Sequence, residues 1–300
     1  MGSVRQMLAQ YGIHPRKKLG QSFLTDMNIT RRIASLAEPA ENETIVEIGA
    51  GLGFLTEELA RKAGRVIALE IDPRLIEALK DRFTGNASVE IVEMDVLEYH
   101  FSAPSPGGKL KVVGNVPYHI STPILFRLLE YRRSISSMVL MFQKELADRL
   151  AAPPGTKEYG IPSVMIARYA SVTRELAVPA SCFYPEPSVA SAVLRIVFAD
   201  DPEPQEEGDL FAWTVRKAFA QRRKTLLNNL HAAGFEGETL AQVFRRVGIE
   251  GGRRAETLSV KEFLLLAAGL AADDDAERIS RRAEGPSWNA QKILDRGGRI

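Results

Sequence analysis

The residues best suited to chemistry stand together in the segment Asn115-Val116-Pro117-Tyr118, directly after an apolar run that ends at Gly114. The side-chain oxygen of Asn115 can accept a hydrogen bond from an –NH2 group, and Pro117 carries a backbone carbonyl without a competing N–H. The ring of Tyr118 can stack on a flat base, a contact that contributes about 1–3 kcal/mol. This set suits a planar base with an exocyclic amine, whereas the alternative is a proline turn with a partly buried tyrosine.

A second chemically suitable set begins in the glycine-rich segment Glu47–Gly53 (EIGAGLG), which follows a predicted strand. The next predicted strand ends at Glu70, whose carboxylate can accept both hydroxyls of a ribose. Dinucleotide-binding loops require G-x-G-x-x-G, but the spacing here is G-x-G-x-G, and Glu47 would place an anion beside a pyrophosphate. S-adenosylmethionine carries a sulfonium and an ammonium group, so these carboxylates favour a methyl donor over NAD. Asp95, after the third strand, can accept from the adenine amino group.

The elements that must position these residues alternate between strands and helices over the first two thirds of the chain. Apolar runs rich in β-branched residues, separated by segments of helical periodicity, predict a mostly parallel sheet covered by helices on both faces. The carboxyl ends of such strands meet at one edge, where ligands bind. The predicted strands are Thr44–Ile48, Arg65–Glu70, Val89–Val92, Leu110–Val113 and Met138–Phe142, with late strands at Arg174–Val178 and Ala192–Phe198. The predicted helices include Asp26–Ala37, Leu52–Ala63, Gly160–Tyr169 and those that begin at Pro73 and Pro123.

The pattern breaks at residues 199–209 (ADDPEPQEEGD), which are acidic and contain proline, as expected of a domain linker. Residues 1–198 are therefore predicted to form an α/β domain preceded by a basic arm. Residues 210–272 show helical periodicity alone, so the prediction is a small all-α domain. Residues 273–300 lack strong periodicity and are expected to be a flexible tail.

Composition limits the class of protein. The net charge of the 300-residue chain is +1, so any nucleic-acid contact must come from local basic groups. Cys182 is the single cysteine, which excludes an intramolecular disulfide and a thiolate metal cluster and fits a reducing cytoplasm. No apolar run approaches the roughly 18–20 residues of a membrane span. We expect a cytoplasmic monomer that binds neither a metal nor a membrane.

At this point the sequence resembles the small-subunit (16S) rRNA adenine N6,N6-dimethyltransferases of the KsgA type. Single motifs are weak signals, but their order along the chain is highly specific. Two of the motifs, residues 218–226 and 254–259, lie in the predicted α domain and favour this family over the related large-subunit dimethylases of erythromycin resistance. The motifs that carry the resemblance are residues 17–24 (KKLGQSFL), 47–53 (EIGAGLG), 70–72 (EID), Asp95, 114–123 (GNVPYHISTP), 183–187 (FYPEP), 218–226 (AFAQRRKTL) and 254–259 (RAETLS).

The resemblance implies a Rossmann-like methyltransferase that dimethylates N6 of two adjacent adenosines in a loop near the 3′ end of small-subunit rRNA. Its partner would be the immature small ribosomal subunit, and methylation would be coupled to the maturation of that subunit. Asn115 and the carbonyl of Val116 or Pro117 would accept the two N–H bonds of the amine. Tyr118 would stack on the base. Phe183 would cover its other face, with core packing as the alternative.

The resemblance also assigns binding residues. The expected contacts to S-adenosylmethionine are Ser22, Leu24, Glu47, Gly49, Gly51, Glu70, Ile71, Asp95, Val96 and Asn115. The basic residues expected to contact RNA phosphates are Arg16, Lys17, Lys18, Arg222, Arg223 and Lys224, with a solvated surface as the alternative for any one of them. The family usually has Asn or His at the position of Ser22, and Lys and Asp at the positions of Ser188 and Ala190.

Three rival functions stay open from the sequence. An NAD(P)-dependent oxidoreductase is the first, although its glycine fingerprint is imperfect here. The second is methylation of large-subunit rRNA, as in the erythromycin-resistance enzymes, or of DNA. The third is a ribosome-assembly checkpoint factor whose catalysis is secondary.

Overall fold

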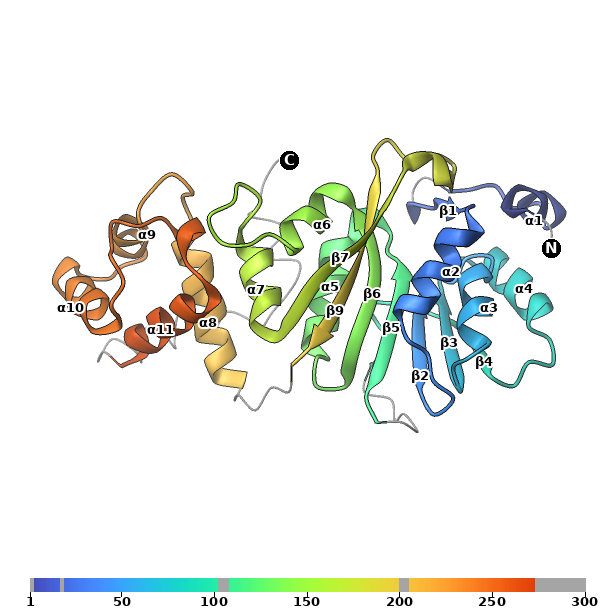
Figure 1. Cartoon of the computed structure of the whole chain (residues 1–300), viewed down its shortest axis with the longest axis horizontal. Coiled ribbons are helices and arrows are strands. Elements are labelled where there is room, and N and C mark those ends of the chain that lie inside the picture. Colours follow the sequence, from blue (N-terminus) through green and yellow to red (C-terminus); the bar gives the residue numbers. More distant parts are fainter. Residues whose placement is uncertain (1–2, 17–18, 102–107, 200–204, 273–300) are drawn as a thin grey trace. The chain divides into compact units, whose positions relative to one another are not determined.

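The computed structural model describes residues 3–16, 19–101, 108–199 and 205–272 of the chain (Figure 1). Within these residues a seven-stranded sheet has the order β4-β3-β2-β5-β6-β9-β7. The strands β2 to β6 are parallel, which confirms the predicted Rossmann-like α/β fold, while β9 runs antiparallel to β6. The bounds are β2 Thr44–Ile48, β3 Arg65–Glu70, β4 Val89–Glu93, β5 Leu110–Asn115, β6 Ile135–Gln143, β7 Ala170–Val178 and β9 Ser191–Phe198.

The central strands are buried on both faces, which explains why they read as continuous apolar runs. Every residue of β2 is buried, and so are all of β3 except Arg65. Gly114 on β5 lies against Ile48 on β2, where an added Cβ would be 2.7 Å from the carbonyl oxygen of Ile48. A side chain at this position would therefore separate the two strands that carry the chemically suitable residues.

Helices pack on this sheet and on one another: α3 contacts β3, α4 contacts β3 and β4, and α2 contacts α3 (Figure 1). Asp26 caps the N-terminus of α2, and Asp72 caps α4, in which Pro73 occupies the first turn. The helix α3 begins at Phe54, later than predicted, because Gly51 and Gly53 adopt left-handed backbone conformations. The bounds are α1 Val4–Gln10, α2 Met27–Leu36, α3 Phe54–Ala60, α4 Pro73–Arg82, α5 Ser121–Glu130 and α6 Lys144–Leu150.

The N-terminal arm is structured where it is described. The helix α1 buries Val4 and Leu8 in a cluster that also contains Leu75 of α4. Further on, β1 (Phe23–Leu24) pairs antiparallel with β8 (Phe183–Tyr184). The arm is thus attached to two distant parts of the first unit, although the sequence predicted only a basic arm.

Two compact units divide the chain, but at boundaries that differ from the predicted ones. The described residues within 1–147 and 171–199 form the first unit, and those within 148–170 and 200–300 form the second. Residues 148–170 belong with the C-terminal helices because α7 (Ile161–Tyr169) packs against α8 (Gln205–Ala218) and α11 (Val260–Ala271). In addition, Tyr159 donates to the carbonyl of Leu258 at 2.8 Å. The predicted linker 199–209 is also too long, since α8 begins at Gln205, just after the last proline of the segment.

The second unit is helical in its described C-terminal part, as predicted. Phe211, Phe263 and Leu266 are fully buried in it, and Gly248 ends α10 in a left-handed conformation. The predicted tail 273–300 lies outside the described residues. Where the structure describes the chain, it contains no helix with the length and apolarity that crossing a membrane requires. The bounds are α8 Gln205–Ala218, α9 Leu226–Ala232, α10 Gly237–Val247 and α11 Val260–Ala271.

Candidate functional site

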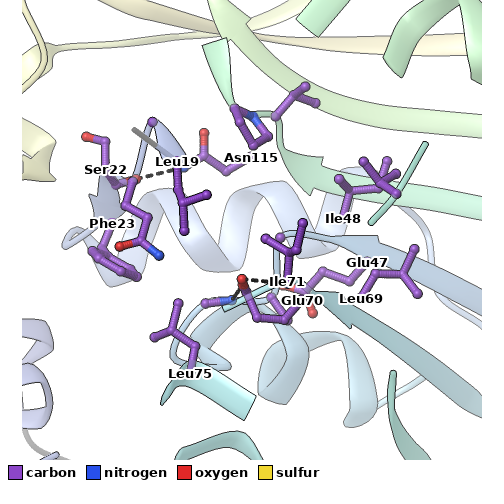
Figure 2. A pocket seen from close by; sticks show the side chains of 18 of the residues that line it. Leu19, Ser22, Phe23, Glu47, Ile48, Leu69, Glu70, Ile71, Leu75 and Asn115 are labelled. Atoms are coloured by element: carbon purple, nitrogen blue, oxygen red, sulfur yellow. Dashed lines mark hydrogen bonds between the residues drawn. The ribbon is translucent and has the colours of Figure 1, made fainter. Parts of the chain in front are cut away.

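A cavity of about 330 Å³ opens in the first unit at the carboxyl ends of β2, β3 and β5 (Figure 2). In Figure 2, Ser22 and Asn115 lie on one side of it, and Glu47 and Glu70 lie on the other. It therefore brings together the two sets of residues that the sequence singled out. The predicted residues that line it are Ser22, Leu24, Glu47, Gly49, Gly51, Glu70, Ile71, Asp95, Val96, Asn115, Pro117 and Tyr118.

The glycine loop between β2 and α3 exposes backbone to this cavity. Gly49, Gly51 and Gly53 have φ angles of 69°, 60° and 77°, a region that side chains with a Cβ rarely adopt. The backbone N–H groups of Gly49 and Ala50 donate to the carbonyl of Leu69 at 3.0 and 3.1 Å, which ties the loop to β3. The loop is thus fixed, and at its glycines a ligand can approach the backbone closely.

Glu70 is held in place by backbone N–H groups. Its Oε2 accepts from Gly51 at 2.9 Å, and its Oε1 accepts from Ile71 at 2.9 Å and from Asp72 at 3.0 Å. Burial raises the pKa of Glu70, and the three backbone hydrogen bonds oppose that rise. Next to it, the apolar side chain of Ile71 is 48% exposed. A carboxylate beside an exposed apolar side chain suits a ribose that carries a flat ring.

Glu47 is the second buried carboxylate of the cavity. Its Oε2 accepts from the hydroxyl of Thr56 at 2.5 Å. Burial raises the pKa of Glu47 to about 8, and the charge of Glu70 adds to the rise. A cationic ligand in the cavity would favour the ionised form of Glu47 and would gain from its charge.

Asp95 follows β4 at the same edge of the sheet. Its Oδ1 accepts from the backbone N–H of Leu97 at 2.9 Å, so the short turn after the strand fixes the side chain. Met94 beside it is 38% exposed, and Val96 is buried. The turn therefore combines a hydrogen-bond acceptor with apolar surface, which is a combination that an adenine ring can use.

The amide of Asn115 has a defined orientation. Its Nδ2 donates to the backbone carbonyl of Ser22 at 3.0 Å, so Oδ1 is left as the acceptor end (Figure 2). The carbonyl of Pro117 is already engaged, because it accepts from Ser121 Oγ at 3.0 Å and from the N–H of Ile120 at 3.2 Å. Of the two carbonyls that the sequence left open, that of Val116 is therefore better placed to receive a second N–H bond.

Tyr118 lines the cavity and is anchored at its hydroxyl, which shares a 2.6 Å hydrogen bond with Ser191 Oγ of β9. Burial raises the pKa of Tyr118, so the phenol stays protonated at neutral pH. The hydrogen bond restricts the ring to one position, as stacking on a base requires.

Phe183 is not brought to the cavity with the other predicted residues. Its side chain is 3% exposed and packs in a core cluster with Ile33 and Val139, where β8 pairs with β1. This location agrees with the alternative of core packing. The hydroxyl of Ser22, in turn, donates to the carbonyl of Pro185 at 2.7 Å, so its side chain serves the attachment of the arm.

The predicted RNA-binding residues differ in their exposure and in whether they already have a partner within the protein. Arg16 is exposed in the arm, while Lys17 and Lys18 lie outside the described residues. Arg222 pairs with Glu256 at 2.9 Å and also donates to the carbonyl of Lys157, so it has a structural role in the second unit. Arg223 and Lys224 are exposed.

Sequence reasoning missed several residues that build the cavity. Asp72 is fully buried, and hydrogen bonds from Arg74 lower the pKa of its carboxyl to about 2. Gln21 donates to Asp72 at 2.8 Å. Both residues stand within motifs of the family resemblance, residues 70–72 and 17–24, but the only sign of a local role was the Asp72-Pro73 pair, which is typical of a helix start. Among the residues that the structure describes, no group of three or more His, Cys, Asp or Glu side chains is arranged to hold a metal ion.

Comparisons with known proteins identify the family that the chain matches. Residues 13–272 match the family model described as ribosomal RNA adenine dimethylase. The ribosomal RNA small subunit methyltransferase A of Syntrophus aciditrophicus is 45% identical over 277 residues, which cover 90% of this chain and 99% of the relative. The protein of the same name from Geobacter sulfurreducens is 45% identical over 271 residues, covering 87% and 97%.

Two solved structures have a similar fold. The 23S rRNA methyltransferase ErmE is 27% identical with a TM-score of 0.68, and the match covers 83% of this chain and 99% of that chain. A dimethyladenosine transferase from Plasmodium falciparum is 27% identical with a TM-score of 0.70, covering 81% and 95%.

Proposed function

The chain belongs to the ribosomal RNA adenine dimethylase family, and we propose that it uses S-adenosylmethionine to dimethylate N6 of adenosines in small-subunit rRNA. The similarity to small-subunit enzymes at 45% identity, against 27% for the large-subunit enzyme ErmE, supports the small subunit as substrate. The targets would be two adjacent adenosines in a loop near the 3′ end, methylated in the immature subunit by a cytoplasmic monomer.

The orientation of Asn115 is the observation that carries this proposal. An exocyclic amine is a poor nucleophile because its lone pair is delocalised into the ring. With Nδ2 committed to Ser22, the Oδ1 of Asn115 can accept one N–H of the amine, and the carbonyl of Val116 can accept the other. Bonds to both hydrogens favour a pyramidal nitrogen whose lone pair is free to react. Positioning of this kind is the main catalytic contribution.

The donor side of the cavity fits S-adenosylmethionine. The backbone of Gly49 and Gly51 would lie against the ligand, Glu70 would accept from its ribose, and Asp95 would accept from its adenine. Glu47 would face the cationic part of the molecule. When bound, S-adenosylmethionine supplies an electrophilic methyl carbon on a positively charged sulfur.

The acceptor side needs no strong general base. A methylated amine that has gained a positive charge loses its proton readily to water, so Asn115 and Tyr118 need only hold the base. Tyr118 would stack on the adenine with its ring fixed through Ser191. An adenine inside a duplex could not enter the cavity, so the target must be unpaired or flipped.

The direct test incubates the protein with labelled S-adenosylmethionine and unmodified small subunits, followed by mapping of the modified nucleotides. Purified large subunits and protein-free rRNA serve as control substrates. We expect N6,N6-dimethyladenosine at two adjacent positions near the 3′ end of the small-subunit rRNA. Label that enters only the large subunit would instead assign the chain the activity of the erythromycin-resistance enzymes.

Phosphate contacts are proposed for Arg16, Arg223 and Lys224. These side chains are exposed, whereas the ion pair of Arg222 with Glu256 makes that residue a weaker candidate. Each lost phosphate contact should reduce the salt slope of binding by about 1.

The experiment compares the double variant Arg223→Gln/Lys224→Gln with Lys62→Gln/Lys80→Gln, which removes two exposed lysines of the first unit. For the first pair we expect a slope of log affinity against log salt that is lower by about 2 on immature small subunits. The control pair should leave the slope unchanged. Equal slopes for both pairs would remove Arg223 and Lys224 from the RNA interface.

A further inference from the structure

The orientation of Asn115 depends on a single backbone carbonyl. A primary amide has one end that donates and one that accepts, and the Nδ2 end of Asn115 donates to the carbonyl of Ser22 at 3.0 Å. The reversed amide would place two oxygens against each other, which is repulsive. Whatever fixes the carbonyl of Ser22 therefore also decides which end of Asn115 can meet a substrate.

Gln21, the residue before Ser22, is anchored at both ends of its side chain. Its Nε2 donates to Oδ2 of Asp72 at 2.8 Å, and its Oε1 accepts from the backbone N–H of Arg16 at 2.8 Å. Both ends of the side chain are therefore used, and the arm is tied to the start of α4. On the other side of Ser22, the pairing of β1 with β8 holds the chain.

Asp72 is a firm anchor for Gln21. Its side chain is fully buried, and it accepts from the backbone N–H of Arg74 at 3.2 Å and from Nε of Arg74 at 3.0 Å. The backbone N–H of Asp72 donates to Oε1 of Glu70 at 3.0 Å. One residue thus supports both the carboxylate on the donor side of the cavity and, through Gln21, the amide on the acceptor side.

We propose that Gln21 is a positioning residue that keeps Asn115 oriented through the carbonyl of Ser22, and that it matters more for the second methyl transfer than for the first. The proposal rests on the proposed function. An unmodified amine donates two hydrogen bonds, so it keeps one to Val116 when Asn115 is misoriented. A monomethylated amine has a single N–H. When that N–H points at a misoriented Asn115, the amine is left without a hydrogen bond.

The test follows both transfers in single-turnover time courses with Gln21→Met, which preserves length but removes both hydrogen bonds. We expect the ratio of second to first rate constants to fall about tenfold, which corresponds to the loss of about one hydrogen bond. Monomethyladenosine should accumulate, and the donor Kd should stay within about threefold of wild type because both polar ends of the Gln21 side chain are bonded within the protein, to Arg16 and Asp72. Gln10→Met, an exposed position on α1, is the matched control.

Gln21→Glu sharpens the test, since it keeps an acceptor for Arg16 but loses the donor to Asp72 and adds a like charge beside it. We expect a lower ratio than in Gln21→Met. If both variants keep the wild-type ratio of second to first rate constants, whether or not both transfers are slowed, the role of Gln21 is overturned. The proposed function stays intact in that case. A wild-type protein that never forms dimethyladenosine overturns the proposed function itself.

Discussion

The two sides of the cavity are built in different ways. On the donor side, the hydrogen bonds that fix Glu70 and Glu47 join residues at most 19 positions apart, within one strand-loop-helix unit and the strand that follows it. On the acceptor side, Asn115 bonds to Ser22 across 93 positions, and Tyr118 bonds to Ser191 across 73. Local sequence therefore determines the donor side, whereas the acceptor side exists only when distant segments have come together.

The largest expected effect separates these two sides by function. Asn115→Ala removes an acceptor for the amine, and a lost group of this type typically costs about 10²–10³ in rate. We expect methyl transfer to fall by about that factor while the donor Kd, measured by calorimetry, changes by about threefold or less. Glu70→Gln should do the reverse, because hydrogen bonds to a charged group contribute about 1.5–3 kcal/mol, so the donor Kd should rise about 10- to 100-fold.

These two variants are each other's controls, since both replace a polar side chain that lines the same cavity. If Asn115→Ala weakened donor binding as much as Glu70→Gln does, the division of the cavity into a donor side and an acceptor side would be wrong.

The next effect concerns the point where the two sides meet. Gly114→Ala would place a Cβ 2.7 Å from the carbonyl oxygen and 2.9 Å from the Cβ of Ile48, and neither β2 nor β5 can move without disturbing the sheet. Overpacking of this kind costs about 1–3 kcal/mol, so the unfolding midpoint of the first unit should fall by several degrees. Gly237→Ala is the control, because an added Cβ there has no heavy atom within 4 Å. If the unfolding midpoint of Gly114→Ala were as high as that of the control, β2 and β5 would be able to move apart without loss of stability.

The same comparison explains what could be predicted from the sequence. The strands β2, β3 and β5 are buried runs of apolar residues, and Glu47, Glu70 and Asp95 stand at or next to strand ends, so their convergence followed from the topology of a parallel sheet. Asn115 was identified by its chemistry. Its partner was not, because nothing in the local sequence of Ser22 indicates which strand its carbonyl will meet.

Long-range packing also explains where the structure departs from what the local sequence favoured. Phe183 sits beside prolines, and only the pairing of β8 with β1 decides that its ring faces the core. Residues 148–170 read as a continuation of the first domain, yet Tyr159 and α7 bury their apolar side chains against the C-terminal helices. The sequence periodicity shows that a side chain is buried, but it does not show which of several apolar surfaces the side chain packs against.

A smaller effect concerns the pH dependence of stability, to which Glu47 on the donor side contributes. Burial raises the pKa of Glu47 from 4.5 to about 8, so the folded protein binds this proton more tightly than the unfolded chain. Between these two values the free energy of unfolding should fall as pH rises, by at most about 1.4 kcal/mol per pH unit from this group. Glu47→Gln should remove this part of the slope when unfolding is measured from pH 5 to pH 8.

Glu41→Gln, which changes an exposed carboxylate near the start of the same strand, should leave the slope as in wild type. If Glu47→Gln retained the wild-type slope, another group would be responsible for the pH dependence, and burial would not hold Glu47 protonated in the folded protein.

The smallest effect tests whether the long-range bond of Tyr118 contributes to the acceptor side at all. Tyr118→Phe keeps the ring that would stack on the base and removes only the hydrogen bond to Ser191, which is worth about 1 kcal/mol. We expect methyl transfer to fall about fivefold, and Ser191→Ala should have a similar effect. Because the two residues share one bond, the double variant should be no slower than either single variant, which a double-mutant cycle measures directly. Additive losses would mean that Ser191 and Tyr118 act independently, and the ring of Tyr118 would then be positioned by its loop alone, as local sequence positions the donor side.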